Sequence, residues 1–287
     1  EDYEAQGVEG VCGECAEKLA RGESITRLAP VRLVELPLNA RLEDVIGGIN
    51  ERAALQHNTV RLDRGILSRA DRNILYIDEV NLLADEIIDA ILDAAAQGQY
   101  TVRRGPMRAT YRSRFVLIGS MNPEEGHLRP QILDRFGLRV LVDGLDDLEE
   151  RRLVYRRMRE YRANPRAFIQ AYEEDTLAAK ADVIAARELL PQVRIPEEVE
   201  ALGVALVQTL GIDSHRAEFT LLEAARALAA ADARDEVTAD DLRTVAPMAV
   251  RMRTSDFMTS FFEREQAEAR RIEKTFDKLR GEVSREG

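Results

Sequence analysis

Residues 73–83 have the sequence Asn73-Ile74-Leu75-Tyr76-Ile77-Asp78-Glu79-Val80-Asn81-Leu82-Leu83, and the rest of the chain can be interpreted around them. The run Ile74–Ile77 is apolar throughout, too short for a helix and bounded by polar residues. This pattern is typical of a strand that is buried on both faces of a parallel sheet. Asp78 and Glu79 follow at once, so the strand would deliver two carboxylates to the carboxyl edge of the sheet, where open α/β sheets bind ligands.

Adjacent acids at a strand end have two interpretations. In the first, one acid holds Mg²⁺ and its neighbour accepts a proton from water, which is the Walker B arrangement of nucleotide hydrolases. In the second, the acids only begin a helix, because Asp and Glu are favoured in a first helical turn. Taken alone, Asp78 and Glu79 do not separate the two interpretations.

The composition indicates a soluble globular protein that is not built to bind nucleic acid. Its 287 residues are 45% hydrophobic and 32% charged, enough for one large domain or two ordinary ones. The formal charge of -11 leaves no excess of basic residues to neutralise phosphates. No apolar run approaches the ~20 residues of a membrane span and no signal peptide is evident, so we expect a cytoplasmic protein, or a stromal one in a plastid.

Both cysteines, Cys12 and Cys15, lie in one Cys-Gly-Glu-Cys motif. One such pair is half of a zinc site, and no second Cys pair or His pair completes it in the sequence. We expect a reduced pair of minor structural importance. The alternative is a metal site, which would need a further ligand from an N-terminal part of the protein or from another subunit.

Strand and helix patterns alternate around the central stretch and predict an α/β domain. Leu83–Gln97 is an amphipathic helix that Gly98 stops, and Phe115–Ser120 is a second apolar strand with Asn122 just beyond its end. The other expected elements are a connecting segment over Glu1–Pro30 with a helical pattern at Glu14–Ala20, a strand at Val31–Leu36, a helical pattern at Arg41–Gln56 broken by Gly47-Gly48, a turn and helix at Arg64–Ala70, hairpin strands at Tyr100–Arg104 and Arg108–Tyr111, a short helix from Pro130 that Gly137 closes, and a buried strand at Arg139–Val142.

Strand patterns end near Gly144, where we place a domain boundary. An α/β domain over residues 1–144 would precede an all-helical domain over residues 145–287. The expected helices of the second domain are Leu148–Tyr161, Pro165–Leu190, Pro196–Leu210, Arg216–Ala231, Thr238–Met248 and a charged Phe257–Leu279.

Asn122, Arg135 and Arg216 follow the acidic strand end in a fixed order, and each has an ordinary explanation. Asn122 can start a turn at the next proline, and Arg135 beside Asp134 can be a surface ion pair worth under ~1 kcal/mol. Arg216 can be a first-turn residue, although a cation there opposes the helix dipole. Together with the two acids, however, they supply what phosphoryl transfer needs, which is a metal ligand, a proton acceptor, a group that positions water and cations for the γ-phosphate.

Several blocks of the sequence carry a resemblance to a known family. They are Leu75-Tyr76-Ile77-Asp78-Glu79-Val80-Asn81-Leu82-Leu83, the run Gly119–Leu138 with its Asn-Pro-Glu-Glu-Gly and Leu-Arg-Pro-Gln motifs, the run Ser214–Leu222 with Ala224–Ala230, and the upstream segment Val34–Asp44. These blocks resemble subunit I of magnesium chelatase, a chelatase-type AAA+ ATPase, over nearly the whole chain.

The resemblance implies a P-loop-type parallel sheet flanked by helices, followed by an all-α helical-bundle lid domain. The hairpin Tyr100–Tyr111 would be the pre-sensor-1 insertion, and Arg41–Gly65 the helix 2 insertion. The implied roles are Asp78 as the Walker B ligand to the Mg²⁺ of MgATP, Glu79 as catalytic base, Asn122 as sensor 1, Arg135 as the arginine finger that reaches a neighbouring subunit's nucleotide, and Arg216 as sensor 2.

The resemblance also implies a biological setting. Family members form a homo-oligomeric ring, a hexamer, that uses ATP and Mg²⁺ and works with a D-like AAA+ partner and a large porphyrin-binding protein of the same chelatase. ATP turnover there drives Mg²⁺ insertion into protoporphyrin IX in chlorophyll or bacteriochlorophyll biosynthesis. An alternative client would make the chain a MoxR-like chaperone or a cobalt-chelatase component. We expect no porphyrin site on this chain, because His is scarce and nothing suggests an apolar aromatic cleft.

One feature of the family is missing, because no G-x-x-x-x-G-K-[ST] occurs in the sequence. This P-loop cradles phosphates with backbone N–H groups and a lysine. In the family it lies just upstream of the position where this sequence starts, and Glu1 is not a Met, so we expect an N-terminal part to be missing. The alternative is a paralogue without a P-loop that serves as a non-hydrolysing scaffold or assembly subunit.

Overall fold

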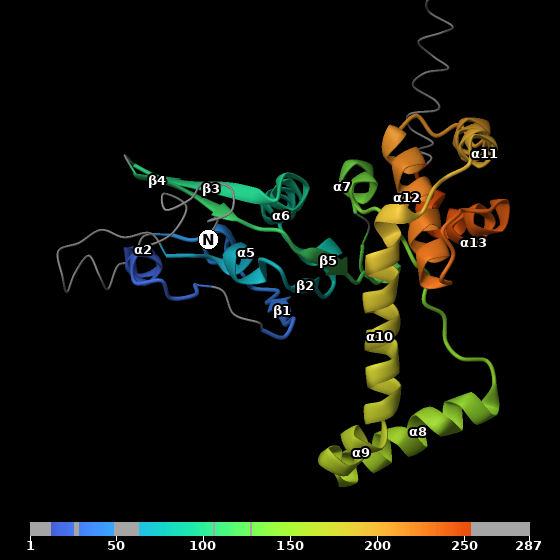
Figure 1. Ribbon diagram of the computed structural model, residues 1–287, viewed down its shortest axis with the longest axis horizontal. Helices are drawn as coiled ribbons and strands as arrows, with labels where there is room; N and C mark the ends of the chain where they lie inside the picture. Colours follow the sequence, from blue (N-terminus) through green and yellow to red (C-terminus); the bar gives the residue numbers. More distant parts are fainter. Residues whose placement is uncertain (1–12, 26–28, 49–62, 106, 127, 254–287) are drawn as a thin grey trace, which may run out of the picture. The chain divides into compact units, whose positions relative to one another are not determined.

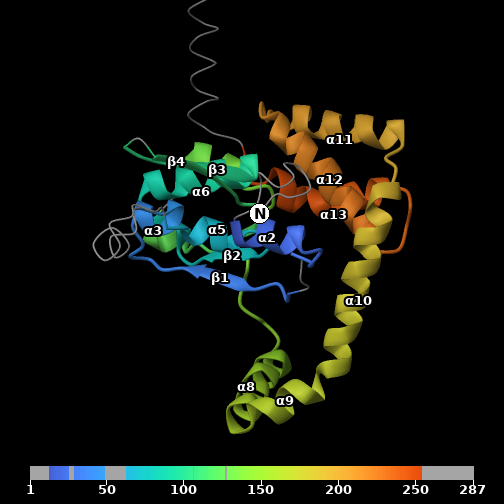
Figure 2. The same ribbon diagram turned by 60° about the vertical axis from the view of Figure 1, so that its left-hand side comes forward.

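The computed structural model describes residues 13–25, 29–48, 63–105, 107–126 and 128–253. The chain forms two compact units, Glu1–Ile132 and Leu133–Gly287, whose elements are labelled in Figures 1 and 2. The first is an α/β unit and the second is all-helical. The division falls inside α7 (Pro130–Arg135), earlier than the boundary that we placed near Gly144.

A three-stranded parallel sheet organises the first unit. Its order is β1 (Leu33–Leu36), β2 (Ile74–Ile77) and β5 (Val116–Gly119), so the strand that precedes the two acids is central. Ile77 is in register with the last residue of both neighbours, and all three strands therefore end at one edge. The predicted parallel sheet is confirmed.

The two faces of this sheet differ. Leu75 and Ile77 of β2 are buried, together with core side chains from the helices of this unit. On the opposite face Tyr76 is only half-buried, and Val116 and Ile118 of β5 are 60% and 45% exposed. The prediction of a strand buried on both faces is therefore wrong for one face. The helix side chains that share the core are Val45, Leu67, Ile87, Ile88, Ile91 and Leu92.

The remaining elements of the first unit follow local patterns. Helix α6 ends at Gly98, which takes the left-handed conformation with φ of 66°, as expected for a helix stop. Gly47 ends α3 at φ of 102°, and a Cβ there would lie 2.1 Å from the carbonyl oxygen of Asp63. Residues 49–62 of the expected helix 2 insertion lie outside the described residues. The bounds are α2 Gly13–Ala20, α3 Leu42–Ile46, α5 Ile66–Ala70, the 3₁₀ turn Val80–Leu82, α6 Asp85–Gln97, hairpin strands β3 Gln99–Arg104 and β4 Met107–Arg112, and the 3₁₀ turn Pro123–Glu125.

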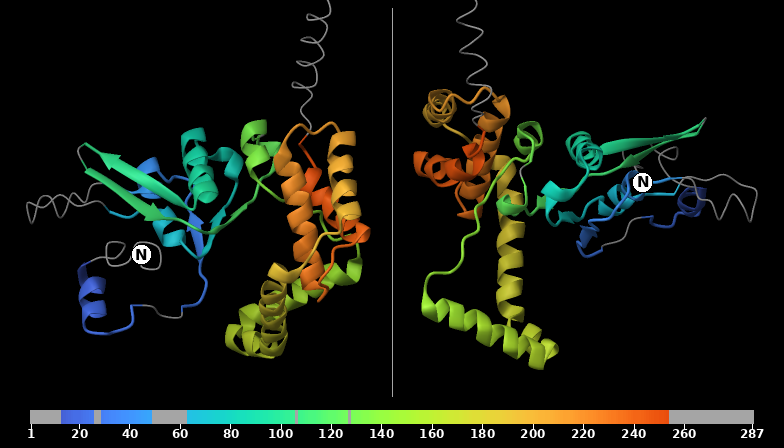
Figure 3. Two further views of the ribbon diagram at one scale, coloured as in Figure 1. Left: turned by 45° about the horizontal axis from the view of Figure 1, so that its top comes forward. Right: turned by 180° about the vertical axis from the view of Figure 1, so that it is seen from behind.

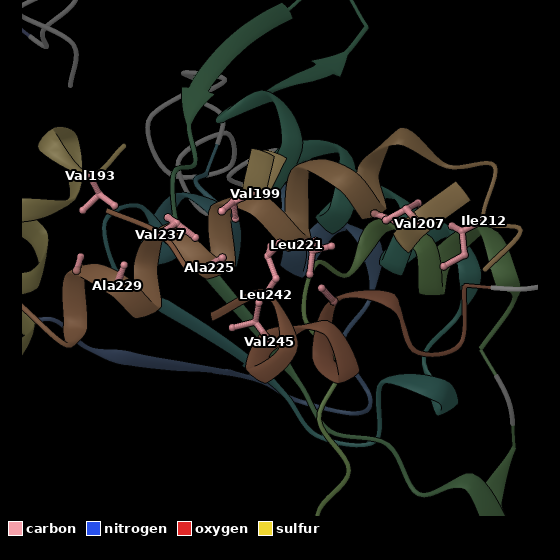
Figure 4. Packing of buried hydrophobic residues seen from close by; sticks show 13 residues of the cluster. Val193, Val199, Val207, Ile212, Leu221, Ala225, Ala229, Val237, Leu242 and Val245 are labelled. Carbon is pink, nitrogen blue, oxygen red and sulfur yellow. The ribbon is translucent and has the colours of Figure 1, made fainter. Parts of the chain in front are cut away.

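A helical bundle forms the core of the second unit. Helices α11 (Glu197–Thr209), α12 (His215–Ala231) and α13 (Ala239–Val250) pack around fully buried side chains such as Leu221 and Val207 (Figure 4). The helices predicted here are confirmed, with bounds that differ by a few residues. None of the described helices is long and apolar enough to cross a membrane.

The expected helix Pro165–Leu190 is interrupted. The structure has α8 (Leu148–Ala163), α9 (Pro165–Ala171) and α10 (Glu173–Leu189), followed by a 3₁₀ turn over Leu190–Gln192 (Figure 3). The break lies at Tyr172, and three acidic residues occupy the first turn of α10 directly after it. Negative charge favours a helix start, so this cluster begins a new helix where periodicity alone suggested a continuous one.

The prediction of a buried strand at Arg139–Val142 is wrong. These residues are in no strand, and Val142 is 90% exposed. The backbone N–H of Arg139 donates to the carbonyl of Met248 at 2.9 Å, and its guanidinium donates to the carbonyls of Leu133 and Arg251. The segment is thus tied to the end of α13 and not to a sheet. The expected helix Phe257–Leu279 lies outside the described residues, as does Cys12.

Candidate functional site

The first carboxylate, Asp78, lies directly beyond β2 and is held by two hydroxyl groups. Because Ile77 pairs with Gly119, the next residues of the two strands, Asp78 and Ser120, are neighbours. The Ser120 hydroxyl donates to Asp78 Oδ1 at 2.5 Å, and the Tyr76 hydroxyl donates to the same oxygen at 3.1 Å. These hydrogen bonds, first that of Ser120, lower the pKa of Asp78, so the exposed group is an ionised carboxylate at neutral pH.

The second carboxylate, Glu79, sits on a constrained turn. Its backbone is left-handed, with φ of 47° and ψ of 53°, which a non-glycine residue adopts only where the surroundings enforce it. The surroundings are again Ser120, whose hydroxyl accepts from the Glu79 N–H at 3.0 Å and whose carbonyl accepts from the Val80 N–H at 2.9 Å. The strained turn presents Glu79 at the same sheet edge as Asp78.

Glu79 also interacts with the turn that follows Asn122. The negative charge of Glu125 is the largest cause that raises the pKa of Glu79, ahead of its partial desolvation and the charge of Asp78. Asn122 begins the turn that carries Glu125, because its side-chain oxygen accepts from the Glu124 N–H at 3.2 Å. The structure therefore brings both predicted acids together with the segment that begins at Asn122.

A buried amide lies beside this turn. Both polar atoms of the Asn81 side chain are buried, and neither has a hydrogen-bond partner within the described part of the chain. A Cβ on Gly126 would lie 3.6 Å from Asn81 Nδ2, so the glycine leaves room next to the amide. Buried polar groups are normally paired, and an orphaned amide beside carboxylates is a polar group available to a bound water or ligand.

The two predicted arginines belong to the second unit, where one of them is anchored. Asp134 Oδ2 accepts from Arg216 at 3.3 Å and from the Ser214 hydroxyl at 3.0 Å, while Asp134 Oδ1 accepts from Arg253 at 2.5 Å. The Arg216 side chain stays 58% exposed. Asp134 therefore offsets the unfavourable charge of Arg216 at the start of α12. Arg135, the next residue after Asp134, is exposed at the end of α7.

The residues at the sheet edge fit a magnesium ion. Mg²⁺ is bound in proteins through one or two carboxylates, with waters and substrate phosphates completing its shell. Asp78 supplies an exposed, ionised carboxylate whose orientation Ser120 and Tyr76 fix. The pKa of Glu79 is raised, which suits this carboxylate to accept a proton.

Ser120 and Glu125 are functional candidates that the sequence analysis did not identify. Serine and glutamate are common, and no spacing marks these two. The register of β2 against β5 would have indicated Ser120, because a residue that follows the paired Gly119 must lie beside Asp78. Glu125 would have required the path of the turn after Asn122, which the sequence pattern does not predict.

Comparisons with known proteins relate the chain to a known family. The family model for magnesium chelatase, subunit ChlI, matches residues 49–142, and the model for the AAA lid domain matches residues 200–274. The magnesium-chelatase subunit ChlI homolog of Methanocaldococcus jannaschii is 43% identical over 260 residues, which cover 90% of this chain and 71% of that protein. The magnesium-chelatase 38 kDa subunit of Acidiphilium rubrum is 42% identical, over 85% of this chain and 70% of its own length.

A solved structure supports the fold alone. The crystal structure of a candidate ATPase from Cytophaga hutchinsonii superposes with a TM-score of 0.55. It is 21% identical, and the match covers 77% of this chain and 68% of that one. The parallel sheet with flanking helices and the following lid therefore belong to a known architecture.

Proposed function

The chain belongs to the family of magnesium chelatase subunit ChlI, and from this premise we propose that it is the ATPase motor subunit of a magnesium chelatase. In this proposal, MgATP hydrolysis in an AAA+ ring is coupled to Mg²⁺ insertion into protoporphyrin IX, a step of chlorophyll or bacteriochlorophyll biosynthesis. The observation that carries the ATPase assignment is the pair Asp78 and Glu79 on a turn that Ser120 locks at the sheet edge.

Each side chain has a role in the proposed hydrolysis. Asp78 would hold the Mg²⁺ that, when bound, offsets the charge of the phosphate oxygens. Glu79 would accept the proton of the attacking water, which Asn122 orients. Arg135, in trans, and Arg216 would supply positive charge for the γ-phosphate, and the exposure of Arg216 leaves it accessible. The sequence has no G-x-x-x-x-G-K-[ST], so these residues account for the metal and the γ-phosphate but not for a phosphate cradle.

The assembly is part of the proposal. We expect copies of the chain to form a ring, a hexamer, that meets a D-like AAA+ partner and the large porphyrin-binding protein of the chelatase. The nucleotide-binding core would correspond to residues 1–144, and the lid with Arg216 to residues 145–287. Reconstitution with both partner proteins and detection of magnesium protoporphyrin by fluorescence tests this assignment against a MoxR-like or cobalt-chelatase client.

The ATPase assignment is tested by changing Glu79 to the neutral amide of the same shape. In the full protein, Glu79→Gln should retain MgATP binding and lose turnover by at least about a hundredfold, because a general base contributes about 10²–10⁴ in rate. Binding is measured with a fluorescent ATP analogue, and turnover by phosphate release. Glu86→Gln, at an exposed position on α6, makes the same charge change away from the site and should behave as wild type.

Two results would count against the ATPase assignment. Full turnover by Glu79→Gln would show that another group is the base. A wild-type protein that binds no MgATP would favour the alternative of a non-hydrolysing scaffold subunit.

A further inference from the structure

The helical arm, which we define as residues 148–185, leaves nearly all of its surface exposed. None of the residues of α8, α9 and α10, all of which the structure describes, is buried. Beyond the arm, Ala186 and Leu189 at the end of α10 pack against the bundle of α11–α13. Figures 1 and 3 show α8 and α9 at the opposite end of α10 from this bundle.

The arm nevertheless carries large apolar side chains at helical spacing. Val154, Met158 and Tyr161 recur at i, i+4 and i+7 of α8 and are 55%, 49% and 44% exposed. On α10, Leu177 and Ile184 are seven residues apart and similarly exposed. Helices gain most of their stability by burying such a stripe, and an exposed apolar patch of this kind marks an interaction surface.

The residue types around the stripe on α8 are those of a protein interface. Arg157 lies over the ring of Tyr172 at 5.6 Å, and that ring packs against Phe168 at 4.8 Å. Tyr161 meets Phe168 edge-on at 5.8 Å. Arginine, tyrosine and methionine are enriched where proteins bind each other, so the arm differs from an ordinary solvated helix.

Charge identifies the partner. Residues 151–166 contain seven arginines and one glutamate, although the whole chain has a formal charge of -11. The arm as a whole is nearly neutral, because residues 148–185 contain eight basic and seven acidic residues, and the positive charge is concentrated in residues 151–166, the basic segment. The remainder of every copy is strongly acidic and complementary to this basic segment. The arginines would also attract a nucleic acid. The acidic remainder of the chain would repel the phosphates of a nucleic acid, however, and phosphates would not bury the apolar stripe.

We propose that the basic segment of the helical arm, residues 151–166, docks on an acidic surface of a second copy of this chain. Contact between two basic segments would oppose like charges, so the basic segment of one copy meets a different, acidic surface of the next, and such a contact can repeat head to tail, as a ring requires. The arm lies between the ranges that the two family models match, residues 49–142 and 200–274. The inference rests on the proposed ring and assigns the interface that holds it together.

The first test replaces an apolar side chain of the stripe. Met158→Glu in the full protein should raise the dissociation constant for self-association at least about tenfold, because an interface anchor typically costs that much when it is lost. Leu202→Glu on α11 is the matched control, since Leu202 and Met158 are both 49% exposed and helical. It should leave self-association unchanged. Sedimentation velocity over a concentration series, with and without MgATP, measures the self-association of both variants. Circular dichroism verifies that the two variants and the wild type have equal helix content.

A second pair of variants tests the charges. Arg156→Glu combined with Arg162→Glu should weaken self-association further, and added salt should weaken it in the wild type, because exposed charges are screened. Arg243→Glu on α13 makes the same kind of change on an exposed position outside the arm and should have no effect. Tyr155→benzoylphenylalanine in a mixture of isotopically light and heavy protein should give crosslinks from the arm to another copy.

The outcomes separate this inference from the proposed function. Unchanged self-association of Met158→Glu and of the double arginine variant overturns the docking role of the arm while the ATPase assignment stands. A wild-type protein that stays monomeric at all concentrations overturns both the ring and the arm. A labelled DNA oligonucleotide that binds wild type but not the arginine variant, with self-association unaffected, also overturns the proposal.

Discussion

At the scale of the residue, Ser120 orients the carboxylate of Asp78 and the backbone of Glu79. Its hydroxyl donates to Asp78 and accepts from the backbone of Glu79, and its carbonyl accepts from Val80. One residue thus favours the ionised form of Asp78 and stabilises the left-handed backbone of Glu79. The acidic turn is held in place before any ligand arrives, and such preorganisation is what electrostatic catalysis needs.

The charge of Glu125 predicts a pH effect. This charge raises the pKa of Glu79, and the proposed base can accept a proton only when it is deprotonated, so the proposal predicts an ATPase rate that rises as the pH passes upward through that pKa. Glu125→Gln removes the charge, lowers the pKa of Glu79 and should move the acidic limb of kcat/KM to lower pH. Glu124→Gln, one residue earlier in the same turn, should leave the limb in place. Steady-state ATPase assays between about pH 4 and 8 measure the position of the acidic limb. The same limb position in Glu125→Gln and Glu124→Gln would contradict the prediction.

The sequence predicted some of these residues but not their interactions. Asp78 and Glu79 were predicted because a short apolar run followed by acids is a local pattern. Ser120 and Glu125 act across the sheet edge, where the partner of a residue depends on strand register and turn path. The sequence analysis considered Asp134 only as a possible surface partner of Arg135, and did not predict its ion pairs with Arg216 and Arg253, which are distant in sequence.

At the scale of the element, the start of α13 combines a capping box with an ion pair in which only the carboxylate is buried. Thr238 and Asp241 bond each other's backbone N–H, and Asp241, 4% exposed, accepts two hydrogen bonds from Arg234. These bonds, first those of Arg234, lower the pKa of Asp241 below 3.8. Asp241→Asn should cost about 1–3 kcal/mol of unfolding free energy at neutral pH, in line with the loss of a charged hydrogen bond.

The sign of the pH dependence follows from that lowered pKa. The ionised carboxylate stabilises the folded state above the unfolded pKa, and the contribution is lost as the pH falls through the folded value, below about pH 4. The difference between wild type and Asp241→Asn in urea unfolding should therefore shrink in acid. Asp240→Asn, at the exposed neighbouring position, is the control. A difference that stays constant down to about pH 2 would argue against the ion pair.

Elements were predicted well where a local pattern suffices. The helix α6, its glycine stop and the hairpin β3–β4 follow from periodicity and turn residues. The prediction of a strand at Arg139–Val142 was wrong because a strand needs a neighbouring strand as its hydrogen-bond partner. In the structure the backbone N–H of Arg139 donates instead to the carbonyl of Met248. The break at Tyr172 was missed because the sequence on either side of it favours helix equally.

At the scale of the whole molecule, the two units have separate cores. The cluster around Leu221 runs from Val193 to Ala249 and lies within the second unit. The core around Leu75 and Ile91 lies within the first. A change from strand to helix patterns led to the predicted boundary near Gly144, whereas the division after Ile132 depends on contacts between residues distant in sequence, which local patterns do not contain.

Separate cores predict separate unfolding. Ile91→Ala in α6 and Leu221→Ala in α12 each remove a fully buried side chain, at a cost of about 2–5 kcal/mol. Because a domain with its own core unfolds as a cooperative unit, each variant should weaken only the unit that contains it. Hydrogen exchange with mass spectrometry reports the protection of each unit separately. Calorimetry should show a lower unfolding temperature for the unit that carries the substitution and an unchanged one for the other unit. Leu202→Ala, at a half-exposed position, should shift neither by more than about 0.5 kcal/mol. If either core variant lowered protection equally in both units, the two units would unfold as one cooperative body, and the prediction would be wrong.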